Sequence, residues 1–165
     1  TDPFGLCNRA NLRGFPPALQ DEMCKGLDEA DQQLAKCPGK SRTPCCDPRN
    51  CVDSSDIAEI RGSLATVTWF FTGNESFLVP RTTACAIRVN SAIAQIAPSA
   101  FDGACGCPLA ALIAHEGAHT KSRPPHIPTE AWGAGGEGEA HCRAVESICF
   151  GCVRPPNPSF APKTR

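Results

Sequence analysis

The sequence predicts a single α+β domain held together by disulfides. Three observations support this prediction: several stretches with helical periodicity, one segment rich in β-branched and aromatic residues, and twelve cysteines among 165 residues. A chain of this length buries about 70% of the surface that its unfolded state exposes, so it builds one core. We expect the domain to span residues 1–154, followed by a proline-rich tail over 155–165.

Helical periodicity is clearest near the N-terminus. Apolar residues recur at helical spacing from Leu19 to Leu34, after Pro16-Pro17, which a first helical turn tolerates. Cys37-Pro38-Gly39 then ends this helix. Further helices are expected over 56–64, 83–96, 108–121 and 137–150.

Strand signals lie in the middle of the chain. Thr66–Phe71 is β-branched and aromatic, which is typical of a strand. Gly73-Asn74 forms a turn signal, and Phe77–Val79 fits a second, returning strand. Helices and strands together predict the α+β class.

The cysteines are open to two interpretations. Structural zinc sites favour paired C-x2-C spacings, but only Cys149 and Cys152 have that spacing, and no second pair accompanies them. An even count without such pairs favours six disulfides instead, and hence an oxidising compartment. We therefore expect a secreted or periplasmic protein, in which no cysteine is left over as a nucleophile.

Charge and hydropathy exclude several classes of partner. The formal net charge is −1 and no basic block is present, so neither a nucleic acid nor an anionic membrane surface is expected to bind. No stretch approaches the roughly 20 apolar residues that a membrane helix needs. Thr1 opens no signal-peptide pattern, so we expect a processed chain or one domain of a longer protein. We expect it to be a monomer.

One short pattern indicates a metal-dependent catalytic site. Residues 114–120 read Ala-His-Glu-Gly-Ala-His-Thr and contain HExxH, inside a segment that periodicity independently predicts to be helical. Residues i and i+4 lie on one face of a helix, so His115 and His119 present two imidazoles to one metal ion. Glu116 projects beside them, where a carboxylate can take a proton from water and return it to a leaving amine. Chance predicts about 0.005 such matches in this composition.

On this motif the chain resembles the zincin superfamily of metallopeptidases. The resemblance implies one Zn²⁺ per chain, a protein or peptide substrate, and peptide-bond hydrolysis by water that the metal and Glu116 activate. It also implies a zincin-like fold, with several helices packed on a small, mostly antiparallel sheet.

The third metal ligand is left open by the sequence. The metzincin subclass needs HExxHxxGxxH, but Ser122 and Pro125 stand where its glycine and third histidine should be. A gluzincin-like ligand comes from a second helix, and Glu137 fits the E-x-x-A pattern on a mostly apolar helical stripe. Glu139 is the alternative, on a face shared with Cys142, Arg143 and Glu146. His126 and Glu130 remain further candidates.

Two histidines outside the motif are candidates for supporting roles. The oxyanion of the transition state is often stabilised by His or Tyr, and this chain has no tyrosine, so His126 and His141 are the candidates for that role. His126, which lies between the two predicted metal-bearing helices, is favoured. Arg123 and Arg143 are weaker candidates for that role. His141 either orients a zinc-binding histidine or is a buried, hydrogen-bonded residue.

The N-terminus carries a second, shorter resemblance. Residues 1–6, Thr-Asp-Pro-Phe-Gly-Leu, look like the element that ends the core of Rhs-type polymorphic toxins. That resemblance implies a toxin that acts in the periplasm on protein or on peptidoglycan peptides, with an immunity or inhibitor protein as partner. An alternative of another class is a disulfide-rich binding protein with a vestigial zinc site. Retention of Glu116 favours the enzyme, because a purely structural site needs no base.

Overall fold

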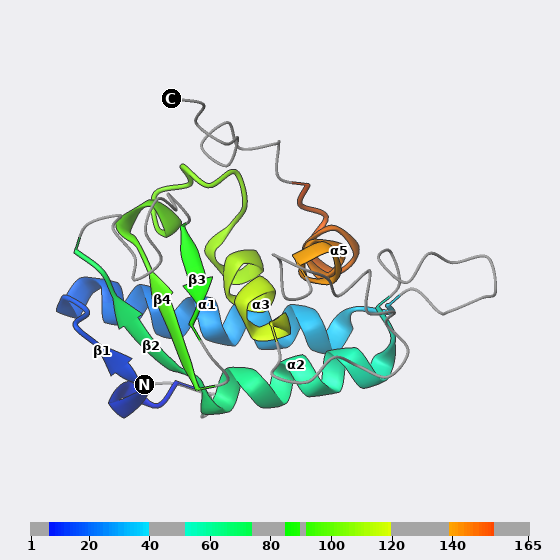
Figure 1. Ribbon diagram of the computed structural model, residues 1–165, viewed down its shortest axis with the longest axis horizontal. Coiled ribbons are helices and arrows are strands. Elements are labelled where there is room, and N and C mark those ends of the chain that lie inside the picture. The colour runs from blue at the N-terminus through cyan, green and yellow to red at the C-terminus, as the bar shows by residue number, and fades with distance from the viewer. Residues whose placement is uncertain (1–6, 40–51, 74–84, 90–91, 120–138, 154–165) are drawn as a thin grey trace.

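The computed structural model describes residues 7–39, 52–73, 85–89, 92–119 and 139–153 (Figure 1). Within these ranges the fold is α+β, as the sequence predicts. The helices are α1 (Pro17–Lys36), α2 (Ser54–Thr66), α3 (Leu109–Ala118) and α5 (Glu139–Phe150), with short 3-10 turns at Arg9–Asn11 and Pro98–Ala100. The strands are β1 (Leu12–Arg13), β2 (Thr68–Phe71), β3 (Ala86–Arg88) and β4 (Ile93–Ile96).

The four described strands form one mixed sheet in the order β1-β2-β4-β3. Strand β2 is parallel to both β1 and β4, and only the edge strand β3 is antiparallel to its neighbour β4. The expectation of a mostly antiparallel sheet is therefore wrong for the described strands. The connection from β1 to β2 passes through α1 and α2, and a helical crossover of this kind brings the chain back to run in the same direction.

The helix predicted over 83–96 is also wrong, because this segment contributes strands β3 and β4. Burial along β4 alternates, with Ala94 and Ile96 fully buried and their neighbours partly exposed. The apolar residues of this short segment fit both the helical periodicity of 3.6 residues and the strand periodicity of two residues. Their β-branched character favours the strand, as does pairing of β4 with β2 on one side and with β3 on the other.

The first two helices start as local chemistry dictates. Pro17 occupies the first turn of α1, where its missing N–H costs nothing. Asp53 caps α2 through a capping box, in which its side chain accepts from the N–H groups of Ser55 and Asp56 while the Asp56 carboxylate accepts from the N–H of Asp53. Both helices were predicted, with ends that differ by a few residues.

Helix α3 is the centre of the molecule. It contacts α1, α2 and α5 as well as the edge strand β3, and in Figure 1 it lies between the sheet and α5. Two glycines allow this close packing. A Cβ on Gly26 of α1 would lie 2.8 Å from Cδ2 of Leu109, and a Cβ on Gly117 of α3 would lie 2.7 Å from Cδ2 of Leu64. Helix α3 is consequently buried from Ala110 to Ala118.

Four disulfides join the described elements: Cys7–Cys24, Cys37–Cys149, Cys85–Cys105 and Cys107–Cys152. They indicate an oxidising compartment, as predicted. Two of them hold α5 in place, because Cys149 in α5 is bonded to the end of α1 and Cys152 just after it is bonded to the start of α3. Such long-range bridges restrict the unfolded chain most.

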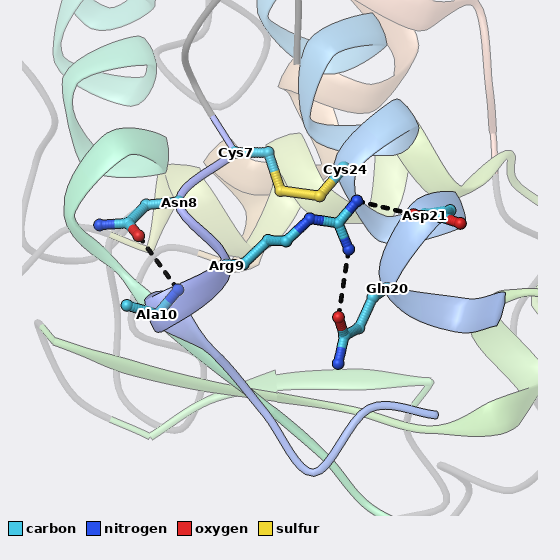
Figure 2. The surroundings of a disulfide bond; sticks show 7 residues. All are labelled: Cys7, Asn8, Arg9, Ala10, Gln20, Asp21 and Cys24. Atoms are coloured by element: carbon cyan, nitrogen blue, oxygen red, sulfur yellow. Dashed lines mark hydrogen bonds and ion pairs between the residues drawn. A yellow bond between two sulfur atoms is a disulfide. The ribbon is translucent and has the colours of Figure 1, made fainter. Parts of the chain in front are cut away.

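The disulfide nearest the N-terminus is reinforced by polar contacts (Figure 2). Arg9 donates from Nη1 to Oε1 of Gln20, at 3.1 Å, and forms an ion pair with Asp21, at 2.7 Å. Together with Cys7–Cys24, these contacts hold the entry of the chain against the first turns of α1.

Some expectations lie outside the described residues, namely the strand at 77–79 and the tail at 155–165. Among the helices that the structure describes, none has the length and hydropathy that a membrane span requires.

Candidate metal centre

Both histidines of the HExxH pattern are presented by the C-terminal end of α3. His115 lies in the last turn and is 2% exposed, and His119 is the residue that ends the helix, with its N–H donating to the carbonyl of Glu116. The two rings lie 5.1 Å apart between centroids, and their Nε2 atoms are 3.3 Å apart. The predicted spacing therefore brings both imidazoles to one point.

Neighbouring elements fix this end of α3 by binding its last carbonyls. Arg88 of β3 donates to the backbone oxygen of Glu116 at 2.6 Å, and the hydroxyl of Ser63 in α2 donates to that of Gly117 at 2.7 Å. The final carbonyls of a helix lack partners within the helix, and a cation there also interacts favourably with the helix dipole. The segment that carries the histidines is consequently held from two sides.

Glu139, the first residue of α5, places a carboxylate oxygen against both imidazoles. Its Oε2 lies 3.1 Å from Nε2 of His115 and 3.2 Å from Nε2 of His119. Its other oxygen, Oε1, accepts from Nε of Arg143 one turn later, at 3.1 Å. Arg143 thereby orients the carboxylate so that a single oxygen faces the histidines.

These three donor atoms have the separations of a metal-binding set. Zinc binds nitrogen and oxygen ligands at about 2.0–2.2 Å in tetrahedral geometry, which places neighbouring ligand atoms about 3.3–3.5 Å apart. The three separations between His115 Nε2, His119 Nε2 and Glu139 Oε2 are 3.1, 3.2 and 3.3 Å. The residues present fit a zinc ion with a fourth position open.

The carboxylates control the protonation of both histidines. Burial works against a charged His115, but its contacts with Glu139 and Glu146 outweigh it and raise the pKa of His115 to about 10. Burial likewise opposes a charged His119, whereas Cys142 and Glu139 raise its pKa to about 12. Glu139 is itself partly desolvated, yet its contacts with the two histidines lower its pKa below the usual range.

A second carboxylate lies on the far side of the His115 ring. Oε1 of Glu146, which is 1% exposed, is 2.9 Å from Nδ1 of His115. The pair is a close charge contact rather than a well-aligned hydrogen bond. Because Nδ1 faces Glu146, Nε2 faces Glu139 and His119, which is the arrangement in which outer carboxylates orient metal-binding histidines.

Cys142 of α5 joins the same cluster. A nitrogen of His115, a nitrogen of His119 and the sulfur of Cys142 all lie within 4.8 Å of one another, so this group could hold a metal ion. Cys142 is fully buried and is not disulfide-bonded. The expectation that every cysteine is paired is wrong at this position.

Glu116 is buried next to the histidines. It is 4% exposed, its charge helps to raise the pKa values of His115 and His119, and its Oε2 accepts no hydrogen bond from the described residues. Leaving a buried carboxylate oxygen unpaired costs free energy, so such groups commonly have a ligand or a catalytic role.

The structure thus brings together His115, Glu116 and His119 with Glu139, the alternative third ligand. Glu137, His126 and Glu130 lie outside the described residues, as does Arg123, and their roles stay predictions. His141 is buried in α5. The face of α5 that meets the imidazoles carries Glu139, Cys142 and Glu146. The sequence pattern favoured a different, mostly apolar face of this helix as the source of the third ligand.

Three residues of the cluster were missed as participants: Arg88, Cys142 and Glu146. A signal was present for two of them, because Cys142 and Glu146 share a helical face with the alternative ligand Glu139. The even cysteine count concealed Cys142, and the apolar stripe drew attention away from this face. No pattern in the sequence indicates a role for Arg88. This residue contacts α3 from strand β3, which lies in a segment predicted to be helical.

Comparisons of the chain with protein-family models, with curated proteins and with solved structures find no match. Inferences about its chemistry therefore depend on the residues of α3, α5 and β3 and on their geometry.

Proposed function

We propose that this chain is a zinc-dependent peptidase of the zincin type. The observation that carries the proposal is the triangle of His115 Nε2, His119 Nε2 and Glu139 Oε2, with sides of 3.1–3.3 Å, next to the buried carboxylate of Glu116. Glu139 takes the role of third ligand in this proposal, in place of the Glu137 that the sequence pattern favours.

Each residue has a defined task in hydrolysis. His115, His119 and Glu139 would hold the ion, and Arg143 orients Glu139 by donating to its other oxygen, Oε1. Zinc bound there would polarise a peptide carbonyl and make water more acidic. Glu116 accepts the proton of the attacking water on its unpaired Oε2 and passes it to the departing amine, the usual work of a general acid–base carboxylate.

A direct test measures metal content and hydrolysis on the same sample. Protein purified without added metal should contain about one equivalent of zinc by elemental analysis. It should cleave casein, a peptide library or peptidoglycan cross-link peptides, lose activity to a chelator, and recover it with zinc. Less than about a tenth of an equivalent, even after zinc is supplied, would refute the proposal.

A second candidate function is supported by Cys142. Four protein ligands make a closed, structural zinc site, whereas catalytic sites keep one position open. If Cys142 joins the other three donors permanently, the chain is a disulfide-rich binding protein whose zinc stabilises the contact between α3 and α5. Zinc at one equivalent without hydrolysis of any substrate class would favour this alternative.

A further inference from the structure

The position of Cys142 contrasts with that of the other described cysteines. Eight of them form four disulfides, including Cys149 two turns further along α5 and Cys152 just beyond that helix. Cys142 is fully buried, unpaired, and within 4.8 Å of ligand nitrogens on both histidines. Among the described cysteines, Cys142 is thus the one left outside a disulfide, and it lies where His115 and His119 converge.

Helix geometry explains why this thiol reaches the cluster. Glu139 and Cys142 are three residues apart in α5, so both side chains lie on the face that packs on α3. Glu139 approaches the imidazoles from the first turn and Cys142 from the next. Cys142 thus offers a sulfur donor close to both histidines, which Glu139 also contacts, and four is the number of ligands that zinc prefers.

Charge balance also favours a thiolate at this position. A divalent cation would be surrounded by the carboxylates of Glu116, Glu139 and Glu146 and by the guanidinium groups of Arg88 and Arg143. These groups leave one positive charge in a largely buried cluster, and burying an uncompensated charge is costly. A metal-bound thiol is deprotonated, so Cys142 supplies the missing negative charge.

We propose that Cys142 is a thiolate ligand of the metal held by His115 and His119, so that the reduced chain holds the ion in a closed site of four donors. It follows, on the basis of the function proposed above, that the reduced chain is partly latent, with hydrolysis slowed rather than abolished. Hydrolysis requires the sulfur to leave the ion, because only then is a position free for substrate and water.

Cobalt substitution tests the ligand directly. The metal-free chain, with its disulfides intact, is loaded with one equivalent of Co²⁺, whose bond to a thiolate gives a charge-transfer absorption band in the near ultraviolet. The wild-type protein should show this band and Cys142→Ser should lose it. Ser147→Ala is the matched control, because Ser147 is exposed on the same helix, and this variant should keep the band.

The outcomes separate this inference from the proposed function. No band in the wild-type protein, or a band that survives in Cys142→Ser, overturns the assignment, and the wild-type spectrum decides even if the variant fails to fold. Zinc-loaded Cys142→Ala should hydrolyse peptides faster than wild type, and equal or slower hydrolysis overturns latency. A band without hydrolysis by either protein refutes the peptidase and leaves the ligand assignment standing.

Discussion

His115 Nδ1 lies 2.9 Å from Oε1 of Glu146, and this contact joins a buried carboxylate of α5 to the end of α3 that carries the candidate metal ligands. The contact determines which nitrogen of His115 is available to a metal. It also holds the ring in place before any metal arrives, because both residues lie on helices that disulfides tie together. Glu146 is thus a positioning residue for the candidate site.

Replacing Glu146 by glutamine should weaken metal binding. The substitution keeps the shape of the side chain but removes the charge that orients His115, and changes of this kind typically cost 10–100-fold in metal affinity. Competition with a chromophoric chelator measures the change. Glu59→Gln, which alters an exposed carboxylate on α2, is the control and should bind like wild type. Unchanged affinity in Glu146→Gln would show that packing alone orients His115.

Metal affinity should also depend steeply on pH. Carboxylates outweigh burial and raise the pKa values of the two histidines to about 10 and about 12, so protons compete with a metal ion for these nitrogens. Each imidazole must lose its proton to bind a metal, so affinity rises with pH. Affinity should rise at least tenfold per pH unit between about pH 6 and about pH 8, because at least one proton is released for each metal ion bound. Chelator competition across this range would contradict the prediction if affinity were constant.

The number of free thiols offers another test. A monomer with twelve cysteines has an even number of free thiols, because each disulfide consumes two cysteines. Eight cysteines are bonded and Cys142 is not. Titration of the denatured, non-reduced protein with a chelator present should therefore find two or four thiols. A count of zero would show that Cys142 forms a disulfide in solution, which would also remove it as a ligand.

Most of the features that were predicted correctly follow from local sequence patterns. Periodicity and end signals located α1, α2, α3 and α5, and the HExxH spacing placed His115 and His119 together. The predictions that were wrong concern features that depend on long-range contacts. The pairing of β4 with β2 makes a strand of residues that fit a helix equally well. The half-buried Glu139 and the buried Glu146 are placed by ionic partners on α3, which no apolar periodicity reveals.

The choice of third ligand can be resolved with a pair of variants. Glu139→Gln removes the charged oxygen that lies 3.1 Å and 3.2 Å from the two imidazoles. It should reduce both zinc content and hydrolysis. The loss should be at least the 10–100-fold in metal affinity or activity that typically follows substitution of a residue that only supports a metal ligand. Glu137→Gln is the matched comparison on the same segment and should leave both intact. The reverse result would restore Glu137 as the ligand.

The decisive test of chemistry is Glu116→Gln. The substitution preserves size and leaves His115, His119 and Glu139 free to bind zinc, so metal content should stay at the wild-type level. An amide cannot accept the proton of the attacking water, and loss of a general base typically costs about 10²–10⁴-fold in rate. The measurement pairs elemental analysis with steady-state hydrolysis of a peptide at neutral pH. If the variant lost its zinc, Glu116 would be part of the metal site rather than the base. If it remained fully active with zinc bound, Glu116 would not be the general base and the mechanism would be wrong.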